Sequence, residues 1–83
     1  MAPKKLEACK THDDFVSYSR KRKARVEPGG RHTLIFPPEG GLVPVPRHKG
    51  DLATGTRYSI IKALTALGMA GLVIMVALQA LIG

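Results

Sequence analysis

The sequence has one cysteine, no tryptophan, only four other aromatic residues and few acidic side chains. Because Cys9 is alone, an internal disulfide is excluded. The charged start, Met1–Lys5, lacks the apolar run of a secretory signal, so a reducing cytoplasmic setting is expected. At 83 residues the chain holds at most one domain. A domain this small is marginally stable alone, which favours a protein partner or a second copy of the chain.

Basic residues strongly outnumber acidic ones. Thirteen Lys and Arg stand against six Asp and Glu, giving a net charge of +7. Residues 63–83 carry no charge, so the whole excess lies on the first 62 residues. This charge density suits a polyanionic partner such as RNA, DNA, an acidic protein or an anionic membrane surface. The alternative is that the basic residues only keep a small protein soluble.

The first third of the chain predicts a short tail and a helix. Residues 1–10 show no hydrophobic periodicity and are expected to be disordered. Thr11 is followed three residues later by Asp14, which is the pattern of a capping box. A helix is therefore predicted from about His12 to Lys21, where basic residues complement the helix dipole.

After this helix the pattern changes to the period of two that is typical of strands. Three extended segments are expected: Ala24–Glu27, Arg31–Phe36 and Leu42–Pro46. The prolines of the third segment permit only an edge strand. Alternation places His32, Leu34 and Phe36 on one face of the second strand. A final helix is predicted from Arg57 onward, capped by Thr54 or Thr56, and the fold class is therefore α+β.

Three elements in this order resemble the HicA family of toxin–antitoxin mRNA interferases. They are Gly30-Arg31-His32 before the apolar strand, Val45-Pro46-Arg47-His48, and Gly55-Thr56-Arg57-Tyr58-Ser59-Ile60-Ile61-Lys62. The family has Gly-Ser-His, Val-Pro-x-His and Gly-Thr-x-x-x-Ile-x-Lys at similar spacing. The resemblance covers residues 11–67. Arg31 stands where the family has Ser, and the Gly-aromatic pair between the first helix and first strand is absent around residues 22–25.

The resemblance implies both a fold and an activity. The fold would be that of a double-stranded-RNA-binding domain, in which a helix, a three-stranded antiparallel sheet and a second helix follow one another. The activity would be cleavage of mRNA by one histidine, neutralised by a HicB-type antitoxin. His32 occupies the position of that histidine. An inactive relative that only binds RNA is a further alternative.

The chemistry of the candidate site rests on His32 and on the basic residues. An imidazole, with an ordinary pKa of about 6.5, can take a proton from an RNA 2′-hydroxyl near neutral pH. The residues expected to contact RNA phosphates are Arg22, Lys23, Arg25, Arg31, Arg47 and Lys49. His48 is a secondary candidate, and His12 is expected to be only an N-terminal helix residue. No metal site or cofactor is expected, because the histidines and Cys9 lack metal-ligand spacing. Alternatively, His32 is a structural strand histidine bonded to a neighbouring carbonyl.

The last 21 residues, 63–83, form an uncharged run. As one helix it would span about 31 Å, close to the roughly 30 Å core of a bilayer. It could therefore be a tail anchor, and the chain a single-pass membrane protein with a basic cytoplasmic segment and no enzymatic activity. It could instead be a long apolar helix that overlaps the last helix of the domain and packs on the sheet or on another copy.

Overall fold

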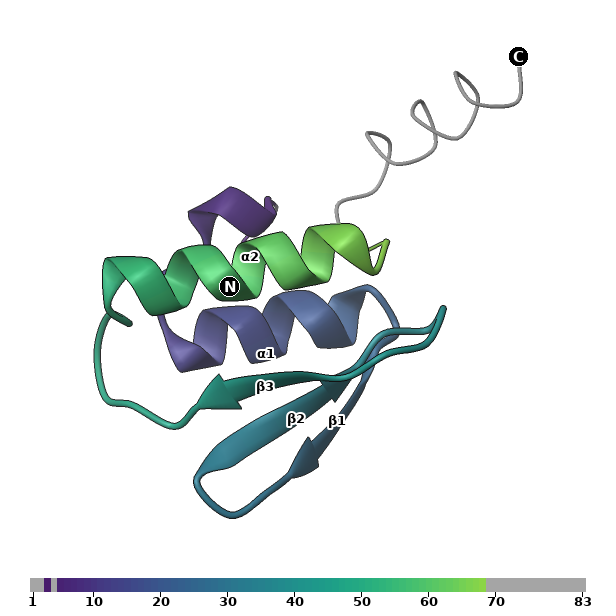
Figure 1. The fold of residues 1–83 in the computed structure, drawn as a ribbon, viewed down its shortest axis with the longest axis horizontal. Helices are drawn as coiled ribbons and strands as arrows, with labels where there is room; N and C mark the ends of the chain where they lie inside the picture. Colours follow the sequence, from purple (N-terminus) through teal and green to yellow (C-terminus); the bar gives the residue numbers. More distant parts are fainter. Residues whose placement is uncertain (1–2, 4, 69–83) are drawn as a thin grey trace.

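The computed structural model describes residue 3 and residues 5–68, and it has an α+β fold. The elements in chain order are the 3₁₀ turn η1 (Leu6–Ala8), α1 (His12–Lys21), β1 (Arg25–Pro28), β2 (His32–Phe36), β3 (Val43–Pro46) and α2 (Thr54–Ala66). The strands form one antiparallel sheet in the order β1-β2-β3. Figure 1 shows both helices over the same face of this sheet, which leaves the other face open.

Alternation along β2 separates buried from exposed side chains. Thr33 and Ile35 are buried toward the helices, whereas His32 is exposed on the open face with Leu34 and Phe36 beside it. This confirms the predicted common face of His32, Leu34 and Phe36. The third strand pairs only with β2 and is an edge strand, as its prolines predicted.

A small apolar core fills the space between the sheet and the helices. Its fully buried members include Phe15 on α1, Ile35 on β2, Val45 on β3 and Leu64 on α2. Such residues stabilise the fold because each removes a large apolar surface from water. The core contains no tryptophan, and Phe15 is its largest fully buried side chain.

The segment before α1 also joins the core, contrary to the expected disorder of residues 1–10. Leu6 and Cys9 are 3% and 0% exposed; η1 begins at Leu6, and Cys9 is its C-cap. The Arg57 side chain donates a hydrogen bond of 2.7 Å to the Cys9 carbonyl and another to the Glu7 carbonyl. A tertiary contact with α2 therefore orders a segment that has no hydrophobic periodicity of its own. Residues 1, 2 and 4 lie outside the described part.

The predicted capping box at the start of α1 is confirmed. The Asp14 backbone N–H donates to the Thr11 hydroxyl over 3.1 Å. In return the Asp14 carboxylate accepts from the backbone N–H groups of Lys10 and Thr11, at 2.9 and 3.2 Å. These hydrogen bonds, that from Lys10 first, lower the pKa of Asp14 because they favour its charged form.

The second helix begins earlier than predicted and lacks the predicted cap. It starts at Thr54, with Ala53 at the N-cap, and no side chain caps its first turn. The first helical hydrogen bond joins the Arg57 N–H to the Ala53 carbonyl over 2.8 Å. Since the Arg57 side chain is bonded to carbonyls before α1, a long-range contact fixes this helix start.

The predicted helix from Ala63 to Gly83 falls mostly outside the described residues, and in the described part α2 ends early in this run. Residue Ala66 is the last of α2, Leu67 is its C-cap, and Gly68 has a φ of 86°. Glycine at this left-handed position ends a helix without steric strain. Residues 63–66 of the uncharged run therefore belong to α2, and residues 69–83 lie outside the described part. Among the described residues, no helix combines the length and apolar character needed to cross a bilayer.

We expect Asp14→Asn to destabilise the fold by about 1 kcal/mol at neutral pH, because a weaker acceptor would replace the carboxylate of the capping box. Asp13→Asn is the matched control, since Asp13 lies in the same helical turn, its side chain is 94% exposed, and asparagine keeps an oxygen that can accept the His12 hydrogen bond. Urea unfolding of the two variants and the wild type measures the effect.

The pH dependence follows from the lowered pKa of Asp14. Its unfolded value is about 3.8, so its contribution is present above that pH and is lost as pH falls through the lower folded value. The difference between wild type and Asp14→Asn should shrink only in strong acid. Equal stability of the Asp14→Asn and Asp13→Asn variants at neutral pH would contradict the capping role.

The buried Cys9 thiol predicts how the stability of the fold changes at alkaline pH. Burial, with the nearby Asp14 carboxylate, raises the pKa of Cys9 from 9.0 to about 12. Above pH 9.0 the unfolded thiol loses its proton while the folded thiol keeps it, so stability should fall as pH rises toward 12. Urea midpoints of Cys9→Ala should fall less over this range than those of the wild type. Urea midpoints that fall equally in the wild type and in Cys9→Ala would refute the raised pKa of Cys9.

Candidate nucleic-acid interface

A tight hairpin presents His32 at the head of β2. The Gly29 N–H donates to the His32 carbonyl over 2.9 Å, with Gly30 and Arg31 between them. A Cβ atom added at Gly29 would lie 2.5 Å from that carbonyl oxygen, whereas one at Gly30 would meet no atom within 4 Å. Only Gly29 is therefore required for the close approach of the two strands.

The His32 side chain is exposed, and within the described residues its ring has no hydrogen-bond partner. The bond to a neighbouring carbonyl that a structural strand histidine would make is not present among the described residues. In the sheet His32 lies opposite Pro46, and Arg47 follows directly. The adjacent loop residue Arg31 is also exposed. The His32 ring is thus open to solvent at the end of the sheet where the backbones of Arg31 and Arg47 lie.

The six basic residues predicted to contact RNA do not form one group. Arg31, Arg47 and Lys49 belong to the hairpin and to the segment after β3, near the head of β2. The other three lie before or at the start of β1, where Arg25 is opposite Phe36. Phe36 lies four positions after His32 along the strand, a distance of about 13 Å. The second group therefore lies at the other end of the sheet.

The second group, Arg22, Lys23 and Arg25, makes contacts with a structural role. The Arg25 guanidinium lies 4.4 Å from the centroid of the Phe36 ring and 3.7 Å from the Glu27 carboxylate. The Arg22 guanidinium lies 4.8 Å from the Tyr18 ring. Lys23 has a φ of 65° and turns the chain from α1 into β1. These cations cover aromatic rings and a turn while remaining exposed.

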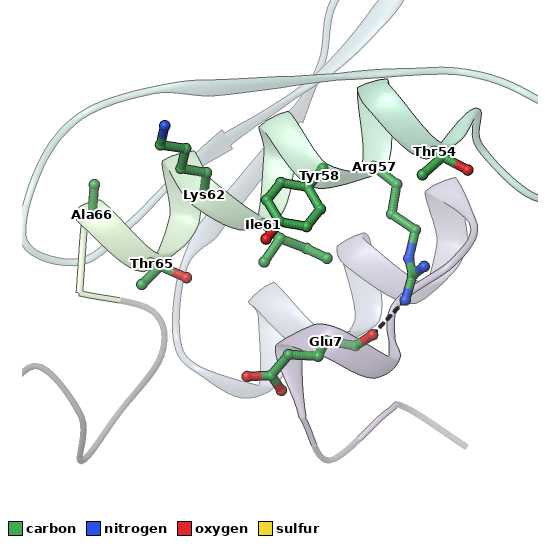
Figure 2. A pocket seen from close by; sticks show the side chains of 8 residues that line it. All are labelled: Glu7, Thr54, Arg57, Tyr58, Ile61, Lys62, Thr65 and Ala66. Carbon is green, nitrogen blue, oxygen red and sulfur yellow. Dashed lines mark hydrogen bonds between the residues drawn. The ribbon is translucent and has the colours of Figure 1, made fainter.

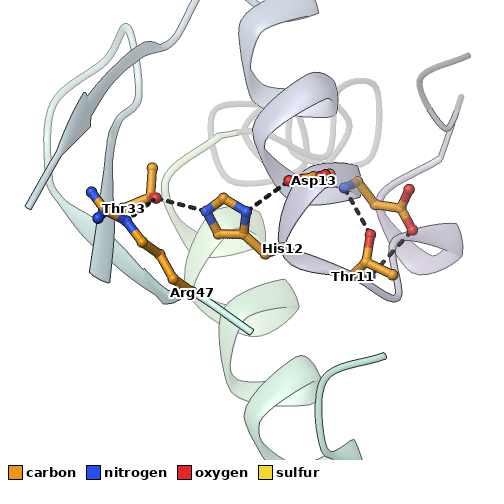
Figure 3. A network of polar contacts seen from close by, with 6 residues as sticks. Thr11, His12, Asp13, Thr33 and Arg47 are labelled. Atoms are coloured by element: carbon orange, nitrogen blue, oxygen red, sulfur yellow. Dashed lines mark hydrogen bonds and ion pairs between the residues drawn. The ribbon is translucent and has the colours of Figure 1, made fainter. Parts of the chain in front are cut away.

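A polar network behind the hairpin joins three segments, as Figure 3 shows. The His12 ring contacts the Thr33 hydroxyl through Nε2 at 2.6 Å and the Asp13 carboxylate through Nδ1 at 2.9 Å. The Arg47 side chain donates to the Gly29 carbonyl over 2.9 Å and to the Thr33 hydroxyl over 3.5 Å. Since a carboxylate only accepts, Nδ1 donates to Asp13, and in the neutral ring Nε2 accepts the Thr33 hydroxyl proton.

Sequence reasoning did not find this network. His12 was expected to be only a helix residue, and Thr33 lies 21 positions away along the chain. The only available signal was that Thr33 falls on the face of β2 opposite His32, which is the face that the helices cover. Neither periodicity nor spacing indicates which helical residue contacts it.

An open cavity lies beside this network, at the start of α1. The residues that line it are Thr11, His12, Asp13, Arg47, His48, Lys49 and Gly50. The secondary candidate His48 and the predicted RNA contacts Arg47 and Lys49 are thus brought together with His12. Thr11 forms an isolated β-bridge with Asp51, and the Leu52 N–H donates to the Lys10 carbonyl over 2.8 Å. The two walls of the cavity are therefore held against each other.

A second hollow runs along the outer side of α2, next to η1, and Figure 2 shows its lining. Its wall includes the exposed Tyr58, Ile61, Lys62 and the Glu7 side chain. None of the residues predicted for RNA contact or cleavage lines it. It is therefore separate from the candidate interface around His32.

Among the described residues, no group of three or more His, Cys, Asp or Glu is arranged to hold a metal ion. No family model, curated protein or solved structure matches this chain. The geometry around His32 and the resemblance of the motifs are therefore what indicate a function for this chain.

We expect Gly29→Ala to distort the hairpin, because its Cβ would clash with the His32 carbonyl. The loss should be at least about 1 kcal/mol of stability, measured by urea unfolding. The matched control is Gly30→Ala, whose Cβ meets open space and which should leave stability unchanged. Similar effects of the two variants would contradict this geometry.

Proposed function

We propose that this protein binds RNA and cleaves it, with His32 as the group that transfers the proton. The observation that carries the proposal is the placement of His32, whose ring is exposed and unpartnered within the described residues at the head of β2. Arg31 and Arg47 lie next to it in the hairpin and beyond its strand partner Pro46. An exposed proton-transfer group directly preceded by an exposed arginine suits phosphodiester cleavage.

The reaction that fits this arrangement uses the RNA as its own nucleophile. His32 takes the proton of a 2′-hydroxyl, and that oxygen attacks the adjacent phosphorus. The new O2′–P bond replaces the P–O5′ bond, and the departing 5′-oxygen receives a proton from the imidazolium or from water. The products are a 2′,3′-cyclic phosphate and a free 5′-hydroxyl. Arg31, which directly precedes His32 and is exposed, would stabilise the negative charge that increases on the phosphate oxygens.

The fold is compatible with this proposal. The order of one helix, three antiparallel strands and a second helix, with both helices on one face of the sheet, agrees with the arrangement that the HicA resemblance implies. We propose accordingly that the domain has a double-stranded-RNA-binding fold and belongs to a toxin–antitoxin pair. A HicB-type antitoxin would inhibit it by covering the exposed His32. The net charge of +7 supports a polyanionic substrate.

The direct test is His32→Ala. Cleavage of a single-stranded RNA should fall roughly 100- to 10,000-fold, which is the usual contribution of one general acid–base group. Binding of the same RNA and the thermal midpoint should remain close to wild type, because the ring is exposed and makes no hydrogen bond to the described residues.

The control for this test is Tyr58→Ala, purified in parallel. It also removes an exposed ring, but on α2, and Tyr58 is 70% exposed. Its cleavage rate should equal that of the wild type, which would show that loss of an exposed ring does not by itself lower cleavage. Undiminished cleavage by His32→Ala would refute the proposed mechanism. RNA binding without cleavage by the wild type would instead identify an inactive RNA-binding relative.

A further inference from the structure

The cavity at the start of α1 has a lining rich in positive charge. Arg47 and Lys49 supply two cations, and the rings of His12 and His48 face the same space. Asp13 is the only carboxylate in this lining. The neighbouring Asp14 carboxylate is occupied by backbone N–H groups. This composition favours an anion over a metal ion or a neutral ligand.

The cationic wall is held in place before any ligand binds. The Arg47 guanidinium is bonded to the Gly29 carbonyl and to the Thr33 hydroxyl, at 2.9 and 3.5 Å. Bonds to Thr33 and Asp13 on its two nitrogens fix the His12 ring. A preorganised site loses little conformational entropy on binding, so it binds more tightly than mobile surface side chains.

The position of the cavity connects it to His32. His32 and Thr33 are adjacent on β2 and point to opposite faces, and Arg47 reaches from the cavity to Gly29 in the same hairpin. The cavity also lies at the N-terminus of α1, where the first N–H groups of a helix favour negative charge. The charge and the location of the cavity therefore suit a phosphate group of an RNA strand whose neighbouring nucleotides lie along the hairpin.

We propose that this cavity binds a backbone phosphate of the RNA strand whose cleavage site lies at His32. The inference rests on the proposed function and adds to it a second place at which the protein contacts the RNA. Lys49 supplies a mobile point charge and Arg47 a fixed guanidinium, which together neutralise the phosphate. The His12 ring, held between Asp13 and Thr33, forms part of the wall and positions Arg47 through the shared Thr33 hydroxyl.

The first test uses inorganic phosphate as the probe on the full chain. Phosphate, but not chloride at equal ionic strength, should shift the ring resonances of His12 and His48 in a saturable way. Lys49→Gln should weaken this binding roughly threefold to tenfold, because one charge–phosphate contact is lost. Lys62→Gln, which removes the same charge from α2 outside the cavity, should leave it unchanged. Equal shifts in phosphate and chloride would overturn the inference.

The second test measures RNA binding as a function of salt. Lys49→Gln should weaken binding and reduce the slope of log K against log salt by about 1, whereas Lys62→Gln should not. RNA binding that both variants weaken equally would overturn the cavity inference and leave the proposed function standing. Phosphate binding in the cavity without any RNA binding would support the phosphate site and overturn the proposed function.

Discussion

The Thr33 hydroxyl joins three parts of the chain at one buried point. It lies on the helix-facing side of β2, where it meets the His12 ring from α1 and the Arg47 side chain from the segment after β3. A buried polar group is costly unless it is hydrogen-bonded, so these partners are needed for Thr33 to occupy this site. The same contacts align the hairpin, the helix start and the cationic loop. The candidate site depends on this alignment.

The strand alternation of β2 links this buried point to the exposed histidine. Because neighbouring residues point to opposite faces, burial of Thr33 and Ile35 places His32 on the open face. A shift of one residue in register would bury the histidine and expose the core side chain. The close approach at Gly29 and the core contacts of Ile35 together fix the register. The exposure of His32 is therefore a consequence of packing on the other side of the sheet.

The distribution of positive charge has two separate physical explanations. At one end of the sheet, Arg22 and Arg25 lie over aromatic rings and contribute to local packing. At the other end, Arg47 and Lys49 line an open cavity beside a helix N-terminus. Net charge alone does not distinguish these roles, because both groups contribute equally to it. Only Arg47 and Lys49 lie toward the end of the sheet that carries His32, and only there does the charge favour a phosphate ligand.

Local chemistry in the sequence determined α1 with its Thr11–Asp14 cap, the three strands and the face on which His32 lies, because these depend on neighbouring residues and simple periods. The tertiary structure alone decided the contact of His12 with Thr33, the cavity that unites Arg47, His48 and Lys49, the burial of Leu6 and Cys9, and the start of α2 at Thr54. Each of these depends on side chains far apart in the chain, and no local pattern encodes which distant groups will meet. The face on which His32 lies was thus predictable from its strand, whereas the side chains that meet around it were not.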